Sequence, residues 1–139
     1  MLLPAGKLAT ALRGRQRVGR TATDGIALHP VEALWCHASG ALELDAKLQV
    51  QLAALAGELL PVAYTDLRQR GIVPTVKGAA LCFQARDGGA DVRLHVASSD
   101  ASASLALLAQ GDWLALVDDA LEIIYYAATA PGWGALPAG

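Results

Sequence analysis

The spacing of apolar residues changes at Gly71, and this change constrains the fold more than any other feature of the sequence. Between Pro30 and Gly71, apolar residues recur every three or four positions, as at Leu48, Leu52 and Leu55, which is typical of a helix that packs on one side. From Ile72 onward they alternate with polar residues, which is typical of strands. The two halves of the chain are therefore expected to fold differently.

Together these patterns predict an α+β protein with two small lobes within 139 residues. We expect a small mixed α/β N-terminal lobe over residues 1–71 and a second lobe over residues 72–130. Residues 131–139 are rich in glycine, alanine and proline, and we expect a tail that cannot hold regular structure without outside contacts.

In the first lobe, glycines and short apolar segments predict two or three short strands within residues 1–27. Pro30 suits the first position of a helix, and Gly40 suits the left-handed residue that follows its end. Asp45 is a good N-cap for a second helix, and we expect Pro61 to begin a third one.

In the second lobe, the sequence predicts the order β-β-β-α-β-β. The helix is expected after the capping residues Ser98, Ser99 and Asp100. The strands are expected at residues 72–77, 80–86, 92–97, 113–117 and 121–127.

The composition excludes several classes of protein. Hydrophobic residues make up 54% of the chain and charged residues only 17%, which excludes a disordered chain. The net charge of −2 argues against a general polyanion binder. Since no apolar stretch reaches the ~20 residues of a membrane helix and the start lacks the order of a signal peptide, we expect a soluble, cytoplasmic protein. A chain so short and apolar buries its surface incompletely, so we also expect an oligomer.

The histidines and cysteines lack the spacing of a metal site. His29, His37 and His95 have no Cys or Asp partner at ligand spacing, and we interpret His95 as a structural residue within a strand. Cys36 and Cys82 lie in apolar runs, which is typical of small buried residues in a reducing compartment. We therefore expect no metal and no cofactor.

Positive charge gathers near the N-terminus. Residues 1–20 contain no acid and these basic side chains: Lys7, Arg13, Arg15, Arg17 and Arg20. The pattern fits a solvated, twisted edge strand, and it also fits a patch that faces phosphate groups.

Residues 64–73 have the sequence YTDLRQRGIV. By itself this segment predicts the end of a helix, because Arg68 and Arg70 meet the negative end of the helix dipole and Gly71 fits the cap. The same string resembles the Y-x-D-L-R-x-R-G-[YIF]-x-V segment of the tRNA-splicing endonuclease family.

Two further stretches resemble the same family, in the same order. Residues 28–34, LHPVEAL, are similar to its L-[ST]-P-x-E-A-[LF] helix start, and GALEL at residues 40–44 follows at the usual interval. Residues 117–126 are similar to its V-x-D-[DE]-G-x-[IV]-x-Y-Y hairpin. The resemblance covers roughly residues 26–127.

The resemblance implies an archaeal-type enzyme that cuts precursor tRNA at bulge-helix-bulge junctions without a metal. Its catalytic subunits use a tyrosine as general base, a histidine as general acid and a lysine that stabilises the transition state. At the positions of these residues this chain has Arg86, residues 89–91 and residues 108–111, and no lysine follows Lys77. The resemblance therefore implies a structural subunit that is not an enzyme by itself, in a heterotetramer with a catalytic subunit of the same fold.

In the family, an acidic loop enters a basic cleft of the neighbouring subunit, and the following strand makes an edge-to-edge contact with another subunit. For this chain the resemblance implies the partner-binding residues Asp118, Asp119, Glu122, Ile123, Ile124, Tyr125 and Tyr126. Precursor tRNA would be met through the complex, and the candidate RNA-facing residues are Arg13, Arg15, Arg17 and Arg20.

Two alternatives stay open. One is an independent, diverged nuclease of related fold that uses Asp91, Arg93 or His95. The other is an RNA-binding module that acts through residues 13–20 without any tetramer, which a steep salt dependence of binding would indicate.

Overall fold

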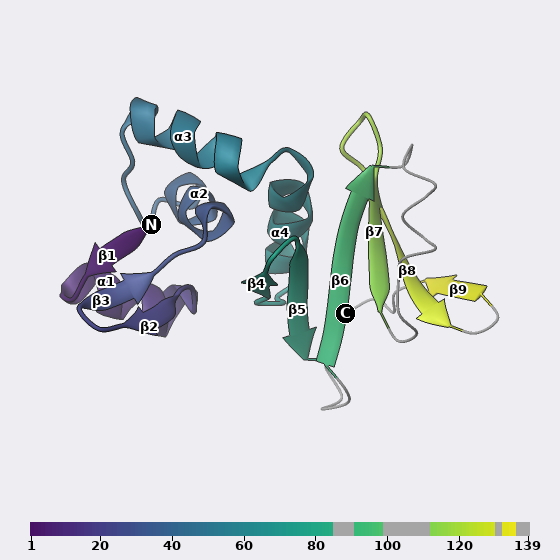
Figure 1. Cartoon of the computed structure of the whole chain (residues 1–139), viewed down its shortest axis with the longest axis horizontal. Helices are drawn as coiled ribbons and strands as arrows, with labels where there is room; N and C mark the ends of the chain where they lie inside the picture. The colour runs from purple at the N-terminus through teal and green to yellow at the C-terminus, as the bar shows by residue number, and fades with distance from the viewer. Residues whose placement is uncertain (85–90, 99–111, 130–131, 136–139) are drawn as a thin grey trace. The chain divides into compact units, whose positions relative to one another are not determined.

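The structure, a computed structural model, describes residues 1–84, 91–98, 112–129 and 132–135. It is α+β, as the sequence predicts, and holds helices and two separate sheets (Figure 1). Internal contacts divide the chain into two units, Met1–Pro61 and Val62–Gly139. Among the described residues, no helix is long and apolar enough to cross a membrane.

The boundary between the two units follows Pro61, within the first turn of α4 (Leu59–Gln69), whereas the sequence predicts it after Gly71. α4 begins at Leu59, so that Pro61 lies in its first turn, where the missing N–H of proline is tolerated. The greater part of this helix therefore belongs to the second unit, instead of closing the first lobe.

The first unit contains a three-stranded antiparallel sheet in the order β1-β3-β2. The strands are β1 (Leu2–Pro4), β2 (Arg20–Ala22) and β3 (Gly25–Ala27). Gly25 has a φ of 158°, and a Cβ atom there would lie 1.7 Å from the carbonyl oxygen of Leu3. Only glycine lets β1 and β3 approach this closely.

Residues 7–16 are helical, which corrects the prediction of strands and turns over residues 1–27. They form α1 (Lys7–Ala11) and the π-helical turn η1 (Leu12–Gln16). Ala9 and Leu12 lie three positions apart and are both buried, so this segment has one apolar side at helical spacing. Gly14 suggested a turn, but within an exposed helix it costs only about 1 kcal/mol relative to alanine.

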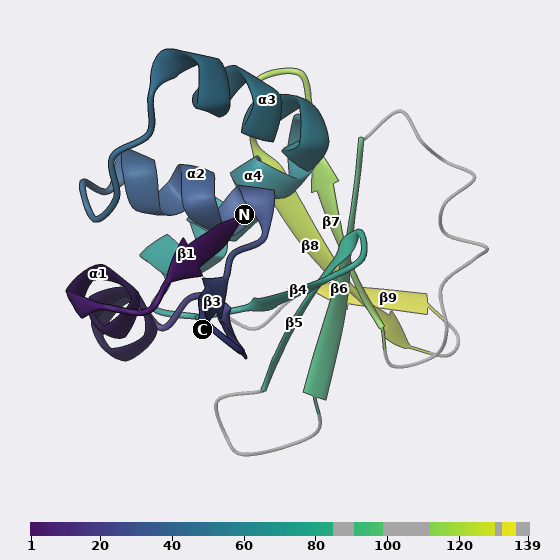
Figure 2. The same ribbon diagram turned by 60° about the vertical axis from the view of Figure 1, so that its left-hand side comes forward.

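The helices α2 (Pro30–Ala38) and α3 (Ala46–Ala56) form where the sequence predicts them, and both figures show them side by side (Figure 2). The Asp45 carboxylate accepts a hydrogen bond from Leu48 N at 2.7 Å and caps α3. Gly40 and Gly57, with φ of 83° and 78°, end the two helices.

The core of the first unit lies between this sheet and the helices. It is built from small and aliphatic side chains, in keeping with the low aromatic content of 5%. Its members include Leu3, Leu12, Val18, Ile26, Leu28, Cys36 and Leu52. Cys36 is fully buried, as expected, whereas Cys82 in the second unit is half-buried.

The second unit contains a six-stranded sheet in the order β4-β5-β6-β7-β8-β9. Its strands are β4 (Thr75–Lys77), β5 (Ala80–Gln84), β6 (Asp91–Ser98), β7 (Trp113–Val117), β8 (Ile123–Thr129) and β9 (Gly132–Ala135). Only β6 and β7 pair in parallel within this sheet. The helix expected between them falls on residues 99–111, which lie outside the described residues.

The strand β9 lies in the predicted tail, residues 131–139, which we expect to hold regular structure only through outside contacts. It pairs with β8 in antiparallel register, from Tyr126 opposite Ala135 to Thr129 opposite Gly132. β8 ends two residues beyond the predicted end at Ala127. Its edge supplies the hydrogen-bond partners for the backbone of β9, which the sequence of the tail alone does not reveal.

Candidate partner interface at the β7–β8 hairpin

The turn between β7 and β8 is held by its first acidic residue. The Asp118 carboxylate accepts hydrogen bonds from the backbone N–H groups of Ala120 and Glu122, both at 2.9 Å. The backbone N–H of Asp118 donates to the carbonyl of Glu122 at 3.0 Å. Such aspartate–backbone bonds fix the shape of a turn. Of the two adjacent aspartates, Asp118 and Asp119, it is therefore Asp118 that stabilises the turn.

The tip of this hairpin, which we define as Asp119, Leu121, Glu122 and Ile124, faces solvent. Leu121 and Ile124 are 58% and 56% exposed. Leu121 also has a φ of 62°, a conformation that a leucine adopts only where its surroundings enforce it. Among the described residues, the carboxylates of Asp119 and Glu122 make no hydrogen bond or ion pair. The tip therefore places two exposed aliphatic side chains beside two carboxylates.

The outer edge of β8 is only partly available. β9 pairs with Tyr126–Thr129, so this part of the edge is already occupied. Of the predicted partner-binding residues, Tyr126 is the one that β9 pairs with. The stretch Ile123–Tyr125 has no such partner within the described residues, so its backbone edge is unpaired there.

Tyr125, one of the predicted partner-binding residues, is directed into the protein. Its ring is buried, and its hydroxyl donates to the Asp66 carboxylate of α4. Asp66 also pairs with Arg70, whose Nε lies 2.8 Å from the same oxygen, and the Arg70 guanidinium stands 5.2 Å from the centre of the Tyr125 ring. Burial, followed by the bond to Asp66 and its charge, raises the pKa of the Tyr125 phenol. The hairpin is therefore anchored on α4.

The same contact joins two of the three stretches on which the family resemblance rests. Asp66 and Arg70 belong to the YTDLRQRGIV segment, and Tyr125 belongs to the hairpin segment. The polar residues that stand out in these stretches thus meet one another, and their role in this chain is to hold the fold.

The third stretch also has a structural role. Glu32 is buried, and its two carboxylate oxygens accept hydrogen bonds from the backbone N–H groups of His29 and Gly19, each at 3.0 Å. His29 Nδ1 accepts from Val31 N at 3.1 Å and caps α2. Burial lowers the pKa of His29, which keeps the imidazole neutral and able to accept this bond.

A second constellation lies on the sheet. His95 Nε2 lies 2.9 Å from the Asp112 carboxylate, and both side chains are partly exposed. This pair is hard to predict from the sequence, because the parallel pairing of β6 with β7 brings together two residues that are seventeen positions apart. A carboxylate that orients an imidazole is a common part of acid–base sites.

The other residues of the alternative nuclease site are not brought together. Asp91 and His95 lie on the same side of β6, four positions apart, which separates them by roughly 13 Å along the strand. Arg93 lies between them and is exposed, as is Asp91.

The remaining histidine, His37, binds backbone. Its Nδ1 contacts Leu42 O at 3.1 Å and accepts from Leu44 N at 3.2 Å. Within the described residues, no group of three or more His, Cys, Asp or Glu side chains converges on a point that would hold a metal ion.

The four candidate RNA-facing arginines are exposed but lie on different elements. Arg13 and Arg15 belong to η1, Arg17 ends it with a φ of 56°, and Arg20 is on β2. The Arg13 guanidinium donates to the carbonyl of Gly19 at 2.9 Å. The structure therefore does not assemble all four into one strand face.

No protein-family model matches this chain, and a search of curated proteins finds no match.

Proposed function

We propose that this chain is a non-catalytic subunit of a tRNA-splicing endonuclease, and that it assembles with a catalytic subunit of the same fold through the β7–β8 hairpin. The observation that carries the proposal is the contact of Tyr125 with Asp66 and Arg70. It joins two of the motif segments and anchors a hairpin whose tip is exposed, acidic and apolar.

The proposal assigns catalysis to the partner because this chain lacks the required side chains. Internal attack of a ribose hydroxyl on the adjacent phosphate requires a base, an acid and a cation held together. No lysine follows Lys77, so the C-terminal part of the sequence cannot supply the lysine of that set. A subunit of this kind contributes through the surface that it offers.

The tip of the hairpin fits a basic, partly apolar cleft. Asp119 and Glu122 would form charge-assisted hydrogen bonds with arginine or lysine side chains of the catalytic subunit. Leu121 and Ile124 would bury the aliphatic surface that they now expose. The carboxylates then set the register of assembly, while the apolar contact supplies most of the affinity.

The test is cleavage, in EDTA, of a bulge-helix-bulge RNA by this chain, by a catalytic subunit, and by the two mixed. We expect activity only in the mixture. The double variant Asp119→Asn/Glu122→Gln should slow the assembly of the two chains and lower that activity at limiting concentrations. The control Glu43→Gln/Glu58→Gln removes the same charge from exposed positions elsewhere and should change neither. If mixing has no effect, the proposal is wrong.

The hydrogen bond between His95 and Asp112 favours one other function, an independent nuclease that works by acid–base chemistry. In that case this chain would cleave RNA alone, and His95→Ala would abolish cleavage. Under the subunit proposal, the same substitution leaves the activity of the mixture unchanged.

A further inference from the structure

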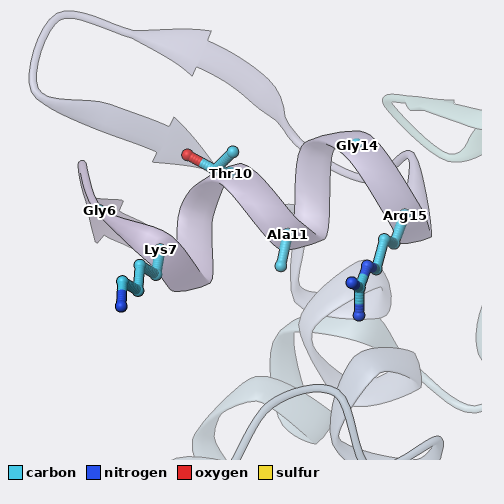
Figure 3. Close-up of a pocket in the computed structure, with 6 residues that line it drawn as sticks. All are labelled: Gly6, Lys7, Thr10, Ala11, Gly14 and Arg15. Atoms are coloured by element: carbon cyan, nitrogen blue, oxygen red, sulfur yellow. The ribbon is translucent and has the colours of Figure 1, made fainter.

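A groove of ≈ 710 Å³ runs along the helical segment formed by α1 and η1. It is lined by Gly6, Lys7, Thr10, Ala11, Gly14 and Arg15. Figure 3 shows Lys7, Ala11 and Arg15 projecting toward the same side of this segment. The small side chain of Ala11 lies between the two cations (Figure 3), and a Cβ atom added at Gly14 would meet nothing within 4 Å.

The two cations of the groove are available for a ligand. Lys7 and Arg15 are exposed, and neither makes a hydrogen bond or ion pair with another described residue. In this they differ from Arg13, which holds the Gly19 carbonyl. No acidic residue precedes Asp24 in the sequence, so no carboxylate from this segment competes for the two charges.

The spacing of the two cations indicates the kind of anion. Lys7 and Arg15 lie eight positions apart, which corresponds to about two turns of the helical segment. Their side chains lie at opposite ends of the groove and do not point toward each other (Figure 3). A single phosphate would meet one of them, whereas a polymer of phosphates laid along the groove would meet both.

We propose that this groove binds the sugar–phosphate backbone of RNA, with Lys7 and Arg15 each neutralising one phosphate. The choice of RNA among polyphosphates rests on the function proposed above. The small side chains of Ala11 and Gly14 let the backbone approach the helix, and the contacts carry no base specificity. The groove therefore adds affinity for precursor RNA, while the partner subunit selects the cleavage site.

The test measures binding of a fluorescent bulge-helix-bulge RNA to the full chain, without any partner, over a series of salt concentrations. Each phosphate contact contributes about 0.7–0.9 to the slope of log K against log salt. For Lys7→Ala/Arg15→Ala we expect the slope to fall by about 1.4–1.8 and affinity at low salt to fall at least tenfold. The control Lys47→Ala/Lys77→Ala removes the same charge from exposed positions outside the groove and should preserve the slope.

Equal losses in the two double variants would overturn the proposal, because net charge alone would then explain binding. Displacement of the RNA by micromolar pyrophosphate would also overturn it, since the site would then accept a short anion. Because no partner is present in this assay, its result is separate from the mixing experiment. Loss of assembly with retained RNA binding would refute the subunit function and leave the polyphosphate groove in place.

Discussion

Replacing Tyr125 by phenylalanine tests whether the hairpin is anchored on α4. The substitution keeps the ring and removes only the hydroxyl that donates to Asp66. A hydrogen bond to a charged acceptor contributes about 1.5–3 kcal/mol. The Asp66 side chain is 30% exposed and stays paired with Arg70, so water replaces part of the lost donor. We therefore expect a loss of about 1.5 kcal/mol in the free energy of unfolding, near the lower end of that range.

Urea unfolding followed by circular dichroism measures this loss. With a slope of about 1–3 kcal/mol per M, the midpoint should fall by roughly 0.5–1.5 M. Tyr126→Phe is the matched control, because Tyr126 is half-buried and its hydroxyl has no comparable partner among the described residues. If the two variants unfold at the same urea concentration, the hydroxyl of Tyr125 does not stabilise the hairpin and the argument fails.

The pH dependence of this difference provides a second check. The pKa of the Tyr125 phenol is raised by burial and by Asp66, so the folded protein favours the neutral hydroxyl. Its contribution to stability is complete below the ordinary tyrosine pKa of about 10 and declines as the pH rises toward the raised value. The gap between wild type and Tyr125→Phe should therefore be constant from pH 7 to 9 and shrink above pH 10. A gap that widens above pH 10 would contradict the assigned bond.

Three more predictions concern other parts of the chain. The pKa of His29 is lowered, so the hydrogen bond from Val31 N to its imidazole is fully present above the ordinary histidine pKa of about 6.5. This bond is lost as the pH falls through the lowered pKa. His29→Asn should keep the cap, so the loss of thermal stability at acid pH should be smaller in this variant. Gly25→Ala places a Cβ atom against the carbonyl oxygen of Leu3 and should lower the free energy of unfolding of the N-terminal unit by more than about 3 kcal/mol. Denaturant titration measures this loss. An unchanged midpoint would show that β1 can move aside. Ile124→Lys places a charge at a position whose side chain is already 56% exposed, so the free energy of unfolding should change by less than about 0.5 kcal/mol. Co-elution with the catalytic subunit should be lost. Retained co-elution would show that Ile124 is not part of the interface.

The sequence predicts best those elements whose ends are determined locally. The capped helices α2 and α3 form as expected because Pro30, Asp45 and Gly40 each act on the nearest turn of backbone. The strand β7 matches its predicted range because its near-continuous apolar run is bounded by polar residues on both sides.

The elements that depend on distant partners could not be predicted in this way. β9 is a strand only because β8 offers it an edge, and its own sequence of glycine, tryptophan and alanine favours no structure. Asp112 gains its importance from the parallel pairing that places it beside His95. Tyr125 looked like a surface residue next to the exposed Ile124, and only the position of Asp66 shows that it faces inward.

The bonds that Asp118 makes within its own turn have a kinetic consequence for assembly. A loop whose shape is already fixed by two hydrogen bonds loses little conformational freedom when a partner binds it. Encounter with a basic cleft would then be limited by diffusion and by attraction to Asp119 and Glu122, with no slow folding of the loop. Added salt should therefore lower the association rate steeply while the lifetime of the assembled complex, which depends on the buried aliphatic contact, changes little.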